Sequence, residues 1–245
     1  MLIRRLIMVL VVLVCARSAD AQTWQERVWA EAGGGIQAGG TSFSDTFDIH
    51  QFAETGSVET GYPAASGATF EGGAGFRVWK RFGAGVAVTR VSSLKSASVS
   101  ARIPHPFFDD RFRDIEGAAN VTHDETDVHV QLSYLVSLAS HVRMILSAGP
   151  SVIDLDQTFV TDVQYSQEYP YDTATYTGAT THRSSANKVG FNVSADGFWM
   201  FSRQVGAGGL VRFTRATVAV DTGNNRSISV DAGGVQATVG LRFLF

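Results

Sequence analysis

The sequence predicts an all-β protein, a closed antiparallel up-and-down barrel of eight strands that spans a membrane. Three observations lead to this fold class. The 245-residue chain is 44% hydrophobic and only 18% charged, yet beyond its N-terminus it lacks an apolar run of the roughly 18 residues that a spanning helix needs. Apolar and polar residues alternate over most of the chain, as in strands with two unlike faces. The connections between these segments are by turns short and long, as in transmembrane barrels.

The first 21 residues have the layout of a secretory signal peptide. A short basic start precedes an almost wholly apolar run, and Ala19 and Ala21 place small residues where a signal peptidase cuts. We therefore expect residues 1–21 to be removed and residues 22–245 to form the barrel domain. Cleavage takes away three Arg, one Asp and Cys15, the only cysteine, which changes the formal net charge from −3 to −5. Lipidation of Cys15 is the less favoured alternative.

Eight segments carry the alternation, and each is expected to cross the membrane once. The last is the clearest, because every second residue from Val235 to Phe245 is apolar and only Leu244 breaks the rule on the other face. The apolar faces should point to lipid and the polar faces into the lumen. The expected strands are Val28–Gly39, Phe70–Trp79, Gly83–Val91, Val128–Leu138, Val142–Ala148, Val189–Trp199, Val205–Phe213 and Val235–Phe245.

The connections between the expected strands alternate between short and long along the chain. The short ones should be periplasmic turns and the long ones extracellular loops. In a soluble β-sandwich, the alternative fold, this alternation of short and long connections is not expected. The expected turns are residues 79–83, 138–142 and 200–205, and the expected loops are residues 41–69, 92–126, 154–186 and the shorter 221–229.

The signal peptide, the eight alternating segments and the ending Gly-Leu-Arg-Phe-Leu-Phe at residues 240–245 resemble the small outer-membrane β-barrel families. These include the barrel of outer membrane protein A and the OmpX and OmpW types. The resemblance implies that the terminal aromatic strand is read by the barrel-insertion machinery, with Leu241, Phe243 and Phe245 as the signal. It covers the whole mature chain as architecture, and the terminal strand is its only specific motif.

Charged residues at the polar positions of the alternating segments are expected to point into the lumen. An eight-stranded barrel is just wide enough for side chains to fill it, so these charges should pair with one another, Glu31 with Arg242 among them. The alternative is that each charge reaches bulk water at a rim. The set comprises Glu31, Glu71, Arg77, His129, Arg143, Asp196, Arg212 and Arg242.

Arg215 falls at a position of its segment whose side chain is expected to face outward. It lies ten residues past Val205, about 23 Å up a strand tilted near 45°, which places it at the outer interface. A guanidinium group binds phosphate in a bidentate fork. Contact with lipopolysaccharide is therefore one interpretation, and an ordinary interfacial arginine is the other.

One aromatic cluster with mixed charges falls outside the expected strands. It lies in the second long connection, and exposed aromatic residues with arginine are typical of contact surfaces. The alternative is an apolar plug that folds over the barrel mouth or onto the interface. The cluster consists of Phe107, Phe108, Arg111 and Phe112.

Enzyme signatures are missing from the sequence. The six His residues have no metal-ligand spacing, and no Gly-x-Ser-x-Gly elbow is present. We expect a monomeric, non-enzymatic outer-membrane protein without metal, cofactor or nucleic acid, which acts through its extracellular loops or stabilises the envelope. Its expected partners are outer-membrane lipid, lipopolysaccharide and, during biogenesis, the insertion machinery. The alternatives are a conduit for small or hydrophobic solutes of the OmpW type and a lipid-A modifying enzyme that uses His129 with Ser133 or Ser147.

Overall fold

The computed structural model describes residues 24–40, 42–223 and 226–245. The expected signal peptide lies outside these ranges. Within them, no helix is long and apolar enough to cross a membrane. The strands are β1 (Val28–Gly39), β2 (Phe43–Gln51), β3 (Glu54–Tyr62), β4 (Gly67–Trp79), β5 (Phe82–Pro104), β6 (Phe112–Ser137), β7 (Val142–Gln167), β8 (Ala174–Met200), β9 (Val205–Gly223) and β10 (Arg226–Leu244).

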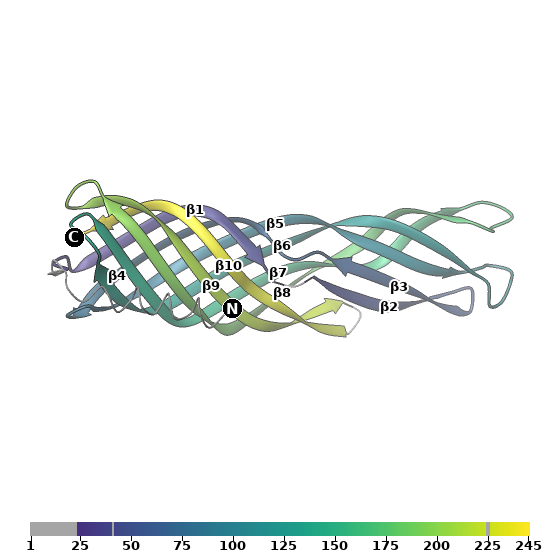
Figure 1. Cartoon of the computed structure of the whole chain (residues 1–245). Coiled ribbons are helices and arrows are strands. Elements are labelled where there is room, and N and C mark those ends of the chain that lie inside the picture. The colour runs from purple at the N-terminus through teal and green to yellow at the C-terminus, as the bar shows by residue number, and fades with distance from the viewer. Residues whose placement is uncertain (1–23, 41, 224–225) are drawn as a thin grey trace, which may run out of the picture.

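Eight of these strands close a ring. The hydrogen-bonded order is β5-β4-β1-β10-β9-β8-β7-β6, and β6 pairs in turn with β5. All neighbours are antiparallel, and β1 closes on β10 with Glu31 opposite Arg242. Figure 1 shows the ring as the broad half of an elongated body, with β1 in purple beside β10 in yellow. The expected up-and-down barrel of eight strands is therefore confirmed.

The wall of this ring has an apolar outer face and a polar inner face. Val130, Val193 and Val239 point outward and are 54%, 52% and 71% exposed. Their neighbours Gln131 and Thr238 point inward and are buried. An exposed apolar band around a closed barrel is the surface that lipid, and not water, accommodates. We call this band the belt.

Beyond the belt, the polarity of the two faces reverses. On β7 the inward residues change from Ser147 and Ser151 to Leu155 and Phe159, which are all buried. A chain in water buries apolar groups inside and leaves polar groups outside, so the reversal marks the outer boundary of the membrane. The outermost apolar residue of the belt and the polar outward residue next to it are Val88 and Arg90, Val128 and Thr126, Val152 and Asp154, Val189 and Asn187, and Phe213 and Arg215, and on β5 the exposed Leu94 lies beyond this boundary.

The segments expected to be long loops are for the most part strands. β5, β6, β7 and β8 run for 23, 26, 26 and 27 residues, so residues 92–126 and 154–186 mainly continue the barrel strands. In the first long connection, β2 and β3 form a hairpin that pairs with the far half of β5. The expectation of loops in these places was wrong. The short turns at residues 79–83, 138–142 and 200–205 lie where they were expected.

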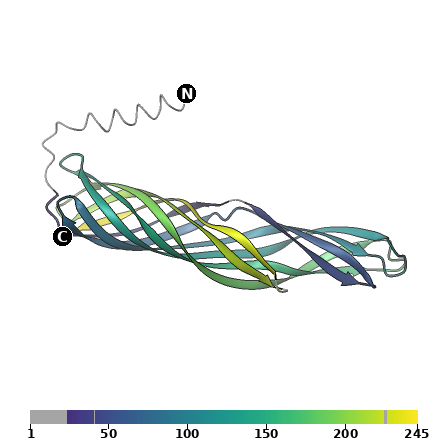
Figure 2. The same ribbon diagram turned by 90° about the horizontal axis from the view of Figure 1, so that it is seen from below.

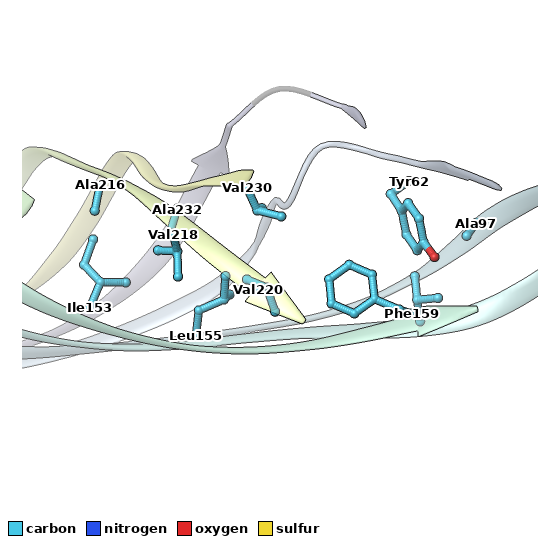
Figure 3. Packing of buried hydrophobic residues seen from close by; sticks show 11 residues of the cluster. Tyr62, Ala97, Ile153, Leu155, Phe159, Ala216, Val218, Val220, Val230 and Ala232 are labelled. Carbon is cyan, nitrogen blue, oxygen red and sulfur yellow. The ribbon is translucent and has the colours of Figure 1, made fainter. Parts of the chain in front are cut away.

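The strands beyond the belt form a folded extension with a core of its own. One apolar cluster joins β3, β5, β6, β7, β9 and β10, and Figure 3 shows Tyr62, Leu155, Phe159 and Val220 within it. The rings of Tyr62 and Phe159 meet edge to face at 5.7 Å. A second cluster of buried side chains fills the space between the β2–β3 hairpin and β5–β7. Figure 2 shows the extension from another side, as the narrow half of the body.

Candidate functional site

Two arginines and three carboxylates occupy the centre of the lumen. Arg242 donates from Nε and Nη2 to the two oxygens of Asp196, at 2.7 and 2.9 Å. Arg212 Nη1 donates to Glu71 Oε2 at 3.0 Å. Glu31 lies between them, with its carboxylate 3.7 Å from Arg242 and 3.9 Å from Arg212. Five strands thus bring opposite charges together where an unpaired charge would be costly.

His129 is connected to this centre through Thr89. Its Nε2 lies 3.0 Å from Thr89 Oγ1, which also accepts a hydrogen bond from Arg212, and its Nδ1 lies 2.7 Å from Ser151 Oγ. Ser133 and Ser147 bond instead to each other, at 2.8 Å. The structure therefore does not bring His129 onto either serine of the lipid-A enzyme alternative. In the ranges that the structure covers, no group of three His, Cys, Asp or Glu residues is arranged to hold a metal ion.

The periplasmic end of the lumen is filled by apolar side chains. Leu244, which breaks the alternation of the last strand, points inward and is 1% exposed. It packs with side chains from the N-terminal segment and from β1, β6, β7 and β8, which together form a floor. The floor consists of Trp24, Trp29, Leu135, Ile145, Phe198, Met200 and Leu244.

Arg77 and Arg143 do not join the central network. Arg77 donates to the carbonyl oxygens of Trp24 and Gln25, and Arg143 forms a bidentate pair with Glu26 at 2.6 and 2.9 Å. Burial acts to raise the pKa of Glu26, but the hydrogen bonds and charge of Arg143 prevail and the pKa is lowered. The two arginines therefore hold residues 24–26 across the periplasmic mouth.

A second polar layer lies above the central network, just outside the belt. Glu125 accepts hydrogen bonds from Gln37 at 3.0 Å and pairs with His123 at 2.6 Å, and His123 also bonds Gln157 at 2.6 Å. Burial works against both charges, but their mutual hydrogen bond and attraction raise the pKa of His123 and lower that of Glu125. Sequence reasoning missed this layer, although His123, Glu125 and His129 share one parity on β6.

The floor, the two polar layers and the apolar core of the extension follow one another along the axis. Each is built of buried side chains from strands on different sides of the ring. The outer face of the same ring is apolar and exposed. The protein is a closed eight-stranded β-barrel of the membrane-spanning type.

The comparisons with known proteins concern the fold. No protein-family model matches the chain, and no curated protein does. Among solved structures, neisserial surface protein A is 14% identical with a TM-score of 0.45, over 89% of this chain and 97% of that chain. The protease OmpT from Escherichia coli is 11% identical with a TM-score of 0.42, over 94% and 100%. The attachment invasion locus protein Ail of Yersinia pestis is 9% identical with a TM-score of 0.36, over 89% and 100%.

Two further sets of predicted residues lie on the outer surface of the barrel. Leu241 and Phe243 lie on the outward side of β10 at its periplasmic end, and Phe245 follows the strand and bonds to Val28 through the backbone. Arg215 is the first polar outward residue on β9, at the outer boundary. Its Nη2 donates to Asp231 Oδ2 at 2.9 Å, so its charge already has a partner.

The aromatic cluster lies at the far end of the extension, where the β5–β6 and β7–β8 turns meet. Phe107 and Phe108 are 69% and 55% exposed, and Tyr169 from the other turn is 83% exposed. The ring of Tyr171 lies 5.5 Å from that of Phe107 and 6.0 Å from that of Tyr169. We call these four residues the distal tip. Because they stand away from the barrel mouth, they do not plug it.

Polar contacts fasten the distal tip to the turns around it. Arg111 Nη2 lies 2.8 Å from Asp172 Oδ1, which ties the β5–β6 turn to the β7–β8 turn. The backbone N–H of Asp110 donates to Glu54 of the β2–β3 hairpin at 2.7 Å. Phe112 is set back on the flank, under the guanidinium of Arg102. Sequence reasoning found the β5–β6 half of this surface but missed both tyrosines, which lie about 60 residues further along the chain.

Proposed function

We propose that this protein is a non-enzymatic, monomeric outer-membrane protein, exported with a cleaved signal peptide, that binds an extracellular partner through its distal tip. The reversal of polarity along the strands carries the proposal. It supports an extension that is folded in water and that presents its largest exposed aromatic cluster at the end remote from the membrane.

The length of the extension supports this role. On β7, the residues from Asp154 to Gln167 follow the outer boundary, and at about 3.3 Å per residue they reach about 45 Å along the strand. A strand tilt reduces the height above the membrane but does not remove it. Such a reach is of use to a protein that contacts something beyond the bilayer surface.

The chemistry of the distal tip favours a protein partner with apolar and cationic groups. Tyrosine is enriched among the few residues that carry most of the binding energy at protein interfaces. Asp109, Asp114 and Glu168 are exposed around the distal tip, whereas Arg111 is already paired with Asp172. Complementary charge on the partner would steer its approach.

The filled lumen argues against the alternative of an open conduit. A solute would have to pass the apolar floor, the Arg212–Glu71 layer and the core of the extension, all of which are buried. Lipopolysaccharide contact at Arg215 is a weaker proposal, because a phosphate would have to displace Asp231. Contact of the insertion machinery with the terminal strand is proposed from the resemblance alone.

Two measurements test the proposal. An epitope inserted between Asp109 and Asp110 should be stained by antibody on intact cells, and staining only after lysis would contradict an extracellular tip. A peptide array graded in apolar and cationic content should bind the wild-type protein in nanodiscs, and F107A/F108A/Y169A should lose that binding. The control is F70A, which changes an aromatic side chain of the belt. Equal binding by the triple variant would reject the tip as the site.

A further inference from the structure

The belt has a groove on one side. It crosses the outer face of β5 to β9 and has a volume of about 520 Å³. Ala148 and Ala195 lie in the middle of the groove. Their side chains are smaller than the leucine and phenylalanine side chains around them, which leaves the surface hollow there. The larger side chains of Leu132, Leu146 and Phe213 line the groove around these two alanines. Apart from the hydroxyl group of Tyr134, the side chains that line the groove on the lipid side are apolar.

The groove extends across five neighbouring strands of the sheet. Leu146 pairs with Ala195 on β8, and Ala148 pairs with Val193, so the groove follows two neighbouring rows of the hydrogen-bonded register. Strands lie about 4.8 Å apart, and the five strands therefore span about 19 Å. Because strands in such barrels are tilted, the groove runs obliquely across the belt. A hydrocarbon chain has this shape and this polarity.

The two ends of the groove differ in charge. Phe213 marks the outer end, and Arg215 above it is neutralised by Asp231. Phe82 marks the periplasmic end and stacks on Trp79 at 6.3 Å, and Lys80 Nζ lies 4.6 Å above the Trp79 ring. No carboxylate among the described residues lies within 4.0 Å of Lys80 or Arg81 to neutralise them. Lys80 and Arg81 are therefore cations without a carboxylate partner beside the periplasmic end of the groove, whereas the arginine beside its outer end is paired.

We propose that the groove is a binding site for one phospholipid of the periplasmic leaflet. One acyl chain lies over Ala148 and Ala195, and the phosphate is held by Lys80 and Arg81. The site is separate from the distal tip, so it holds whether or not the tip binds a partner.

Native mass spectrometry of the purified full-length barrel tests the site. The protein is exposed in detergent to phosphatidylglycerol and to lipopolysaccharide. The wild type should retain one phosphatidylglycerol. A148L/A195L fills the groove and should bind at least about tenfold more weakly, and K80Q/R81Q should also bind more weakly. The matched control A32L/A74L adds the same bulk to the belt on β1 and β4 and should bind as the wild type does.

Three results would overturn the site: no retained phospholipid, equal retention by A148L/A195L and A32L/A74L, or retention of lipopolysaccharide instead. Heat-modifiable migration on a gel reports whether each variant folds. Should A148L/A195L fail to fold, phosphatidylglycerol with a photoreactive acyl chain is crosslinked to the wild type. Labels on β6 to β9 would then support the groove, and labels spread evenly over all eight barrel strands would refute it.

Discussion

Arg212 on β9 and Glu71 on β4 form an ion pair in the middle of the lumen, and both side chains are 0% exposed. The pair joins strands on different parts of the ring, and Thr238 adds a hydrogen bond to the second oxygen of Glu71 at 2.6 Å. The lumen therefore has a charged centre in which both oxygens of Glu71 accept hydrogen bonds from protein groups.

The first prediction concerns this pair. Arg212→Met leaves Glu71 buried without its main partner, and breaking a buried pair costs about 3 to 5 kcal/mol. Urea titration in detergent should show that loss. R212M/E71Q removes both charges and should recover most of it. If the double variant is no more stable than R212M, the pair is not what makes the single change costly.

A second prediction tests the outer boundary on β8. Val193 and Asn187 point outward on the same strand, but only Val193 lies within the belt. Val193→Arg should cost about 2 to 4 kcal/mol of folding free energy in lipid, whereas Asn187→Arg should cost almost nothing. Equal losses in the two variants would mean that both positions face the same solvent.

The third prediction separates the core of the extension from its tip. Phe159 is fully buried, while Phe107 is mostly exposed. Phe159→Ala should destabilise the extension by about 3 to 5 kcal/mol, and Phe107→Ala should leave its stability unchanged. Proteolysis of the intact barrel reports this, because an unfolded extension is cut between residues 92 and 126. Resistance of both variants to protease would contradict a folded core at Phe159.

The fourth prediction follows from the lowered pKa of Glu26. Since the folded state holds this carboxylate charged, the Arg143 pair stabilises the N-terminal segment above the usual pKa of 4.5 and is lost as the pH falls below it. Trp24 packs under the Arg143 guanidinium, so its fluorescence should change in that acidic range. Glu26→Gln should abolish the pH dependence. A transition that persists in E26Q has another origin.

The barrel itself could be read from the sequence. In the belt, one face meets lipid and the other a polar lumen, so apolar and polar residues alternate strictly, as from Val235 to Phe243. The eight alternating segments gave the number of barrel strands, and the lengths of the connections indicated which end faces the periplasm. The pairing of Glu31 opposite Arg242 follows once the first and last strands close the ring.

The extension could not be read in the same way, for a physical reason. Around the outer boundary the lumen is still polar while the outer face already meets water, so both faces of residues 123–127 on β6 are polar and the alternation disappears. That stretch therefore resembled the start of a loop. Arg77 and Arg143 had the expected inward parity, but the segment that they bind, residues 24–26, carried no pattern that placed it under the barrel.

The folded extension and the remote tip both depend on the position of the outer boundary. The barrel domain contains no cysteine, so single cysteines can carry a fluorescent label at outward positions of β6. Labels at Leu132, Val130 and Val128 should be quenched by brominated lipid, and labels at Thr126 and Asn120 by aqueous iodide. A step between Val128 and Thr126 is the predicted result. Lipid quenching that continues through Asn120 would contradict the account.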